Sequence, residues 1–325
     1  MRPRLKNLFI AFAFAVSAIF FCLLSRGFND SGEPTILQVS APRAPGKPTG
    51  SLRIASMNCK NYLSTNRYTA DGKYKRRWAK PLAEREAMWQ LFAAIRPDLV
   101  ALQEIGGQAH LDQLAGDLLR ETGLEFPHRV CLEARDQSRR IGIISAVPFK
   151  TVFRYPEEEL MSRGVLGVEV AAGTQRLRVF TLHLKSKISR SEADPECAAE
   201  RLAEARCAAE RIAESGGTLY ILAGDFNDTP ESDAVTSLIQ ENALKRLDLK
   251  DSRGETWTYR HFKTNKKDTF DHFLISSDLA AFKVKDSGKI ADEALAKRAL
   301  SDGTGAYASD HRMIFADFFF PQSED

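Results

Sequence analysis

Polar side chains that can bind metal ions or move protons stand where apolar runs of this sequence end. Six positions follow or open such runs, and they are Asn58, Glu104, His183, Asp225 with Asn227, Asp271, and Asp310 with His311. A single carboxylate after a strand is usually a turn residue or a helix cap, but so many are hard to explain as independent caps. Because strand ends are where α/β proteins assemble their sites, the pattern predicts one active site.

Metal binding is the first chemistry that these residue types allow. Mg²⁺ prefers oxygen ligands, usually one or two carboxylates, with water and substrate phosphate completing the coordination shell. Glu104 is the first candidate ligand, and Asn58 and Asp310 are candidates close to it. The sequence contains no CxxC or HxxxH spacing, which argues against a zinc site.

Proton transfer is the second chemistry that these residue types allow. A histidine paired with a carboxylate can act as a general acid or base near neutral pH, and Asp271 with His311 is the candidate pair. Asp225 can orient a water molecule, and Asn227 can donate a hydrogen bond to a developing oxyanion. His183, at the end of an apolar run, is a further catalytic candidate. With a bound cation, these groups suit the hydrolysis of a phosphoric ester.

Strands and helices alternate along the part of the chain that must position these residues. Apolar runs typical of strands cover 52–57, 99–103, 141–145, 165–170, 177–183, 218–223, 270–276 and 313–319. Helical periodicity predicts helices over 83–95, 111–122 and 195–214, and the first two end before a proline and at a glycine. Such alternation predicts an α/β protein with a layered core of mixed sheets.

The same residues stand in motifs that resemble those of the endonuclease/exonuclease/phosphatase superfamily. In chain order these are Asn58, LQEIGG around Glu104, HLKSK around His183, GDFND around Asp225, FDHFLIS around Asp271 and SDH around His311. The resemblance extends from about Ser51 to Phe320, and LQE, GDFN and SDH in this order make it specific. It implies a four-layer α/β sandwich, with two packed mixed β-sheets flanked by helices and the site at the edge between the sheets.

The resemblance also implies roles for the motif residues. It places Mg²⁺ or Mn²⁺ at the glutamate of LQE, with Asn58 and Asp310 near it. It implies that the aspartate and asparagine of GDFN act on the nucleophile and on the phosphate, and that Asp271 orients His311. Members of the superfamily differ in whether the aspartate of GDFN or the histidine of SDH is the base, and both assignments stay open for this sequence.

His183 separates branches of the superfamily. A histidine in this strand resembles pancreatic deoxyribonuclease, the neutral sphingomyelinases and the phosphoinositide phosphatases. HLKSK together with WTYRHF is more similar to a group of exported bacterial nuclease-like proteins. The resemblance therefore identifies the superfamily and leaves the branch open.

Several basic and aromatic residues are candidates for substrate contacts. Arg140 before IGIIS and Lys185 in HLKSK are candidate phosphate ligands, and a salt bridge or a solvated charge explains each equally well. The run KYKRRWAK at 73–80 interleaves cations with Tyr74 and Trp78. That mixture is typical of a surface that follows a nucleic-acid backbone, and the alternative is an exposed, charged loop before a helix. WTYRHF at 257–262 is a cover over the substrate or edge packing.

The first residues predict export. Arg2, Arg4 and Lys6 precede an apolar run at 8–24 that is long for a signal peptide and just long enough to span a bilayer. The positive-inside rule places the rest of the chain outside the cytoplasm. We expect a signal peptide or signal anchor at 1–26, a Pro/Gly/Ser-rich linker at 27–50 and the catalytic domain at 51–321. The protein is then periplasmic or at the cell surface, and it is secreted or, if the segment is uncleaved, anchored in the membrane.

Four cysteines lie beyond the first segment, and an exported domain permits disulfides between them. They are Cys59, Cys131, Cys197 and Cys207. The last two open the two halves of a local repeat, CAAERLAEAR and CAAERIAESG, which has the pattern of one helix. Ten residues of helix place the two sulfurs about 15 Å apart, too far to form a bridge with each other.

Composition indicates a folded, soluble protein, and a net charge of +3 is too small for a general polyanion binder. Our first hypothesis is an exported Mg²⁺-dependent phosphodiesterase, a nuclease that hydrolyses DNA or RNA by in-line attack of an activated water. The second is a phospholipid or inositol-phosphate hydrolase, although no long apolar hairpin follows Ser51. The third is an inactive surface binding protein on the same scaffold. No protein partner is implied.

Overall fold

The structure is a computed structural model that describes residues 46–68, 73–156, 159–189, 191–299 and 305–321. These residues belong to one compact unit. The segment 1–26 and the linker as far as residue 45 lie outside the described residues. In the described part of the chain, no helix combines the length and the apolar character that a membrane crossing requires.

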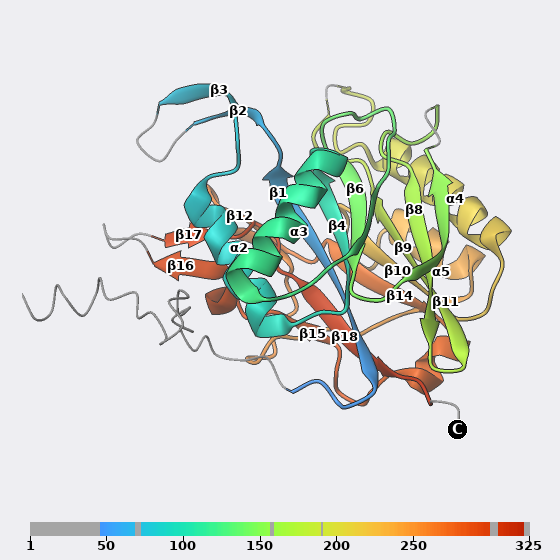
Figure 1. Cartoon of the computed structure of the whole chain (residues 1–325). Helices are drawn as coiled ribbons and strands as arrows, with labels where there is room; N and C mark the ends of the chain where they lie inside the picture. Colours follow the sequence, from blue (N-terminus) through green and yellow to red (C-terminus); the bar gives the residue numbers. More distant parts are fainter. Residues whose placement is uncertain (1–45, 69–72, 157–158, 190, 300–304, 322–325) are drawn as a thin grey trace, which may run out of the picture. The chain divides into compact units, whose positions relative to one another are not determined.

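Helices and strands alternate through the described ranges (Figure 1). The helices are α2 (Leu82–Ile95), α3 (Gln108–Thr122), α4 (Ala198–Ser215) and α5 (Asp233–Glu241), with 3-10 turns η1 (Asp278–Phe282) and η2 (Glu293–Ala296). The strands are β1 (Ser51–Tyr62), β2 (Thr65–Tyr68), β3 (Tyr74–Trp78), β4 (Leu99–Ile105), β5 (His128–Cys131), β6 (Arg140–Ser145), β7 (Phe149–Tyr155), β8 (Val165–Ala172), β9 (Gln175–His183), β10 (Tyr220–Asp225), β11 (Leu244–Arg246), β12 (Tyr259–His261), β13 (Lys266–Asp268), β14 (Asp271–Ser276), β15 (Lys289–Ile290), β16 (Lys297–Ala299), β17 (Gly305–Tyr307) and β18 (Ile314–Phe319).

Two six-stranded mixed sheets repeat one pattern of strand directions. The first has the order β15-β18-β1-β4-β6-β5 and the second the order β11-β14-β10-β9-β8-β7. Each sheet has a parallel pair at its centre, β1 with β4 and β9 with β10. An antiparallel strand flanks each pair, β18 beside β1 and β14 beside β10. In each sheet, therefore, the two parallel strands end and the antiparallel strand begins at the same edge.

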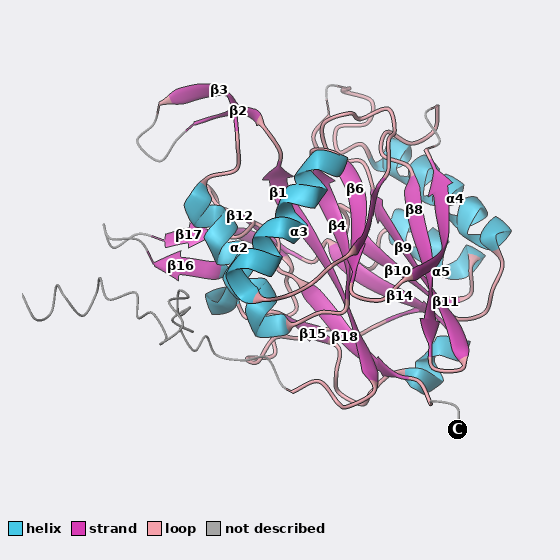
Figure 2. Ribbon diagram, in the orientation of Figure 1, coloured by secondary structure: helices cyan, strands magenta, loops and turns pink. Residues whose placement is uncertain are grey.

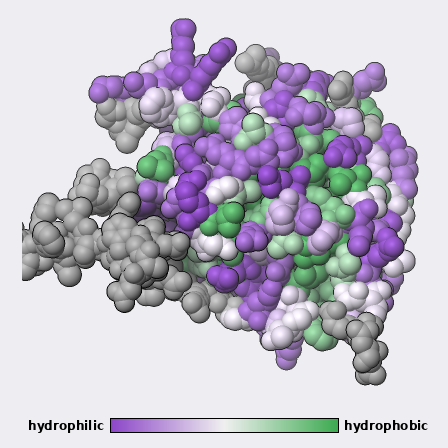
Figure 3. All heavy atoms as spheres, viewed as in Figure 1, coloured by the Kyte–Doolittle hydropathy of each residue, from purple (hydrophilic) through white to green (hydrophobic). Residues whose placement is uncertain are grey.

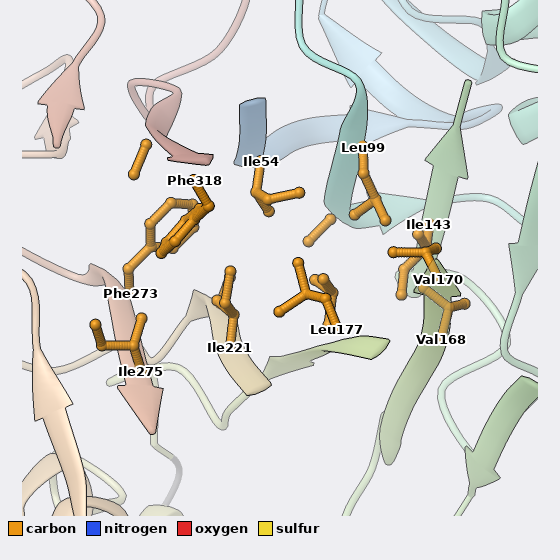
Figure 4. Close-up of a cluster of buried hydrophobic side chains, with 14 of the residues drawn as sticks. Ile54, Leu99, Ile143, Val168, Val170, Leu177, Ile221, Phe273, Ile275 and Phe318 are labelled. Atoms are coloured by element: carbon orange, nitrogen blue, oxygen red, sulfur yellow. The ribbon is translucent and has the colours of Figure 1, made fainter. Parts of the chain in front are cut away.

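The two sheets pack face to face, and helices cover their outer faces (Figures 1 and 2). Between the sheets, Ile54 and Leu99 of the first pack with Ile221 and Phe273 of the second (Figure 4). The next residue of β1, Ala55, faces the opposite way and packs with α2 and α3, because side chains alternate along a strand. The outer face of the second sheet packs with α4 and α5. This order of layers confirms the predicted four-layer α/β sandwich.

Every predicted strand and helix is present, with ends displaced by a few residues, but the charged run before α2 is not a loop. Residues 74–78 form β3, which pairs with β2 in a two-stranded hairpin. Lys80, at the end of the run, is buried and donates to Glu84 and to the carbonyl oxygen of Lys60. The hairpin was missed because it has no apolar face that would give an alternating pattern.

The four cysteines at 59, 131, 197 and 207 are all buried, and none of these described residues forms a disulfide. Cys197 and Cys207 lie at the start and in the body of α4, as the repeat predicts. Burial raises the pKa of the Cys59 thiol to about 12, so this neighbour of Asn58 is a packed thiol and not a nucleophile.

Candidate active site

The strand directions of the second sheet bring three of the motifs together. Asp225 ends β10 and lies opposite His183, which ends the parallel strand β9. On its other side, Asp225 lies opposite Asp271, the first residue of antiparallel β14. A Cβ at Gly224 would collide with the carbonyl oxygen of Leu182, which explains the glycine of GDFND.

The first sheet supplies the other half of the site. The side-chain amide of Asn58 lies 2.9 Å from Asp225 Oδ2 and 3.4 Å from Glu104 Oε1. Glu104 Oε2 accepts a hydrogen bond of 2.7 Å from the backbone N–H of Asn61. Glu104 has a φ of 61°, a left-handed conformation that costs a non-glycine residue roughly 1–3 kcal/mol. The strain marks Glu104 as a residue that the surrounding structure holds in place.

Asp225 lies at the centre of the site. Its Oδ2 is 3.4 Å from His183 Nε2 and 3.7 Å from His311 Nε2, and its Oδ1 accepts from the backbone N–H of Asn227. Burial raises the pKa of Asp225 to about 7, against the opposing charge of His311. The carboxyl group can therefore exchange a proton near neutral pH.

The two histidines beside Asp225 hold opposite protonation states. His311 Nδ1 lies 2.8 Å from Asp271 Oδ2. Burial opposes a charge on His311, but the carboxylates of Asp271 and Asp225 outweigh it and raise the pKa of His311 to about 10. Burial, reinforced by the charges of Arg163 and His311, lowers the pKa of His183 well below its usual value. A charged and a neutral imidazole thus flank one carboxyl group, the separation of acid and base that catalysis uses.

Asp310 lies at the rim of this group. Its side chain accepts from Ser309 Oγ, and its backbone carbonyl accepts from the N–H of Arg260. Burial raises the pKa of the nearby Tyr259 to about 12, and the charges of Asp310 and then Asp225 add to the effect. The Tyr259 ring packs against His311 with the ring centroids 4.8 Å apart. Tyr259, from the WTYRHF segment and the first residue of β12, therefore lines the site beside His311.

Two sets of candidate metal ligands lie in this region. Asp225, Asp271 and His311 offer ligand atoms within 4.8 Å of one another, and His311 Nδ1 lies 2.8 Å from Asp271 Oδ2. Glu104 also suits a hard cation, because its side chain is partly exposed and, among the described residues, Oε1 has only the long contact to Asn58. A cation at Glu104, with Asn58 and Asp310 beside it, stays a prediction, and the side-chain amide of Asn58 lies 3.4 Å from Glu104 Oε1.

Three other predicted site residues already form hydrogen bonds or an ion pair within the protein. Arg140 donates to the carbonyl oxygen of Gly106 and pairs with Glu133 at 2.6 Å. Lys185 Nζ lies 2.9 Å from the carbonyl oxygen of Ile188, and one amide hydrogen of Asn227 is directed to the carbonyl oxygen of Leu184. Substrate contacts by Arg140 and Lys185, and an oxyanion contact by Asn227, stay predictions.

The sequence analysis missed a group that joins the two halves of the site. Arg139 donates to the side chain of Asn61 at 2.8 Å and lies 4.0 Å from Glu104. Arg163 pairs with Asp136 and is directed to the carbonyl oxygen of Leu184. Both guanidinium groups act on His183 and help to keep it neutral. Arg139 stands next to the chosen Arg140, and no feature of the sequence distinguishes the two.

Two buried residues of α4 hold the loops behind the site and were also missed. Arg201, whose side chain is 1% exposed, pairs with Asp228 of GDFND at 2.7 Å and donates to the carbonyl oxygen of Lys185. Glu204, one turn later, accepts from the backbone N–H groups of Ser162 and Lys185. The helix thereby connects the loops that follow β9 and β10, the strands that carry His183 and Asp225.

His272, the residue after Asp271, is the third buried histidine of this region. Its Nε2 lies 2.9 Å from the carbonyl oxygen of Asp228, so Nε2 carries a hydrogen. Nδ1 is buried, and nothing in the described ranges hydrogen-bonds to it. Burial lowers the pKa of His272 to about 4. The folded protein therefore holds this ring in its neutral form.

We expect His272 to make the protein less stable in mild acid. The unfolded chain binds a proton near pH 6.5, so the contribution is complete above that pH and is lost as the pH falls toward the folded value. Between pH 7 and pH 5, the wild type should lose about 2 kcal/mol more free energy of unfolding than His272→Gln. Urea unfolding of both proteins at the two pH values measures this, and His183 cancels in the difference. Equal losses in the two proteins would contradict the prediction.

Comparison with known proteins gives one family and a set of similar folds. The model of the endonuclease/exonuclease/phosphatase family matches residues 75–311, more than half of the chain. A search of curated protein sequences finds no significant match.

Solved structures with a similar fold belong to proteins whose names indicate different activities. TDP2 from D. rerio, complexed with a single-strand DNA product, has a TM-score of 0.55 at 22% identity and covers 83% of this chain and 99% of its own. Sphingomyelinase C from Streptomyces griseocarneus has a TM-score of 0.56 at 17% identity, over 82% and 99%. A beta toxin mutant from Staphylococcus aureus with bound magnesium ions has a TM-score of 0.56 at 15% identity, over 83% and 100%. At these identities the likeness concerns the fold.

Proposed function

The chain belongs to the endonuclease/exonuclease/phosphatase family, whose members hydrolyse phosphoric esters, and we propose that it is a Mg²⁺-dependent phosphodiesterase that cleaves nucleic acid. The observation that carries the proposal is the position of Asp225. It lies between a neutral and a charged histidine, and Asn58 joins it to Glu104. This is an arrangement for activating water next to a cation that holds a phosphate.

Proton transfer in the proposed reaction runs through the second sheet. Asp225 accepts the proton of the attacking water, whose oxygen bonds to phosphorus as the opposite P–O bond breaks, and the leaving oxygen takes up a proton from solvent. The neutral His183 donates toward Asp225 and helps to orient its carboxylate. His311, held by Asp271, presents its charged Nε2–H to the phosphoryl oxygens and stabilises the charge that develops on them. The base is then the aspartate of GDFN, one of the two assignments that the sequence left open.

The first sheet holds the substrate phosphate in place. Glu104, with Asn58 and Asp310 beside it, would hold Mg²⁺, which would supply a positive charge that polarises the phosphoryl group. The N–H of Asn61 holds the Glu104 carboxylate, and Arg139, which donates to the Asn61 side chain, lies 4.0 Å from it. Asn58 donates to both carboxylates and so separates their negative charges.

Nucleic acid is our first choice of substrate, and a phospholipid is the second. TDP2 is a neighbour in fold that was captured with a single-strand DNA product, and a cationic hairpin stands beside the first sheet here. The similarity to sphingomyelinase C favours a lipid. An inactive scaffold is the weakest alternative, because the groups of all the motifs meet in one place.

Parallel hydrolysis assays test the proposal. The full-length protein, in a non-ionic detergent, is incubated with plasmid DNA, single-stranded DNA, RNA, sphingomyelin or bis-p-nitrophenyl phosphate, with Mg²⁺, Mn²⁺ or EDTA. We expect metal-dependent cleavage of nucleic acid and of the chromogenic diester. Turnover of sphingomyelin with nucleic acid intact would keep the mechanism and assign the lipid substrate. Turnover of none of them would favour the inactive scaffold.

Replacing Glu104 with glutamine is expected to weaken Mg²⁺ binding. Glutamine keeps a side-chain oxygen but loses the negative charge that binds a hard cation. The Mg²⁺ concentration at half-maximal activity should therefore rise about 10–100-fold. A magnesium titration of bis-p-nitrophenyl phosphate hydrolysis measures it. Glu125→Gln, at an exposed glutamate after α3, is the matched control and should titrate like the wild type. An unchanged titration of Glu104→Gln would place the cation elsewhere.

A further inference from the structure

The hairpin of β2 and β3 exposes aromatic rings and cations together. Tyr68, Tyr74 and Trp78 are 72%, 51% and 45% exposed, which is unusual for rings of this size. All five residues of β3 are exposed. Figure 1 shows the hairpin apart from the two sheets, beyond the end of β1, and the same region carries strongly hydrophilic side chains in Figure 3.

Three cations of β3 have no ion pair within the described residues. The described residues of β2 and β3 include no carboxylate, and Lys75, Arg76 and Arg77 form no ion pair with a described residue. Arg67 lies directly opposite Lys75 in the hairpin register, and like charges in that position destabilise a strand pair. A bound polyanion would offset the repulsion between Arg67 and Lys75.

Among the described residues of the hairpin, rings and cations are interleaved. Tyr68 and Tyr74 lie 5.3 Å apart in a tilted pair, and Lys75 lies over the Trp78 ring at 5.4 Å. A wedge that enters a bilayer gathers its apolar side chains on one face. Aromatic platforms with cations between them are instead the arrangement that binds bases and phosphates of a single strand.

The base of the hairpin is bonded to the metal side of the candidate site. Arg67 donates to the carbonyl oxygens of Asn61 and Leu63. The N–H of that same Asn61 donates to Glu104. Lys60, two residues after Asn58, lies over the Phe262 ring at 4.4 Å. A strand bound along the hairpin would therefore lead to Glu104.

We propose that the β2–β3 hairpin is a docking surface for single-stranded nucleic acid, on which Tyr68, Tyr74 and Trp78 stack with bases while Lys75, Arg76 and Arg77 contact phosphates. The inference rests on the proposed function, since it names the form of substrate that reaches the same site. It assigns the sequence run KYKRRWAK to substrate selection, except for the buried Lys80.

Binding without turnover tests the hairpin separately from the catalytic site. Fluorescence anisotropy of a labelled twelve-nucleotide oligothymidine is measured with full-length protein in EDTA, between 50 and 200 mM salt. Tyr68→Leu/Tyr74→Leu should weaken binding about tenfold and leave the salt dependence unchanged, because it removes stacking only. Lys75→Gln/Arg76→Gln should weaken binding and lower the slope of log K against log salt by about 1.4, since each phosphate contact contributes about 0.7.

Lys150→Gln/Arg154→Gln, at two exposed cations of β7, is the matched control and should bind like the wild type. Thermal unfolding verifies that each variant is folded, and the two hairpin variants test stacking and charge independently. Unchanged oligonucleotide affinity in both would overturn the proposal. If both variants instead lose binding to vesicles of phosphatidylcholine with phosphatidylserine, the hairpin is a membrane contact. A wild type that hydrolyses no diester would refute the proposed function, whatever the anisotropy shows.

Discussion

Replacing His311 with glutamine is expected to lower kcat for phosphodiester hydrolysis by about 10³-fold, with little change in KM. Glutamine can still hydrogen-bond to Asp271, but it cannot carry the positive charge that Asp271 and Asp225 stabilise on the imidazole. A positioned acid or base contributes about 10²–10⁴-fold to a reaction, and the fully buried site strengthens the effect of the charge. Steady-state kinetics on bis-p-nitrophenyl phosphate at saturating Mg²⁺ measures it.

A double-mutant cycle tests whether Asp271 acts through His311. Asp271→Asn alone should also reduce kcat, because it removes the partner of His311 Nδ1. The double variant should be no slower than His311→Gln, since residues that act as one unit are not additive. His128→Gln, at a histidine of β5, is the control. If His311→Gln keeps more than about a tenth of wild-type kcat, the role given to its charge is wrong.

The strand ends made the site predictable. A polar residue at the end of an apolar run lies at one edge of the sheet, because both strands of a parallel pair end at that edge and the antiparallel neighbouring strand begins there. Asp225, His183 and Asp271 met in register for this reason. The same reasoning could not assign the base, because the split between Asp225 and His311 depends on burial and on distances that strand order does not give.

Local sequence also failed where two equal residues have different environments. Arg201 and Arg211 occupy the same position in the two halves of the CAAER repeat. Arg201 is fully buried against Asp228, whereas Arg211 pairs with Glu214 one turn away on the same helix. The difference comes from the loops that pack on the first half of α4, which the repeat does not contain. Arg139 and Arg140 present the same problem, because only the register of β6 decides which one reaches Asn61.

Replacing Arg201 with methionine is expected to lower the free energy of unfolding by about 3–5 kcal/mol, the usual cost of leaving one member of a buried ion pair alone. Methionine fills part of the space but leaves the Asp228 carboxylate with Lys187 as its remaining cation. The carbonyl oxygen of Lys185 loses a donor as well. Urea unfolding at pH 7 measures the change. Arg206→Met on the same helix, at an exposed arginine 3.8 Å from Glu241, is the control and should change stability by less than about 1 kcal/mol.

The charge of Asp228 is what makes the Arg201 substitution costly, and this can be separated from lost packing. Adding Asp228→Asn to Arg201→Met removes the carboxylate that has lost its buried partner and keeps only Lys187, so the double variant should be more stable than Arg201→Met alone. If Arg201 only filled space, the second substitution would remove the Lys187 pair and destabilise the protein further. A loss below about 1 kcal/mol in Arg201→Met, or no recovery in the double variant, would therefore refute the claim that α4 holds the GDFND loop through this ion pair.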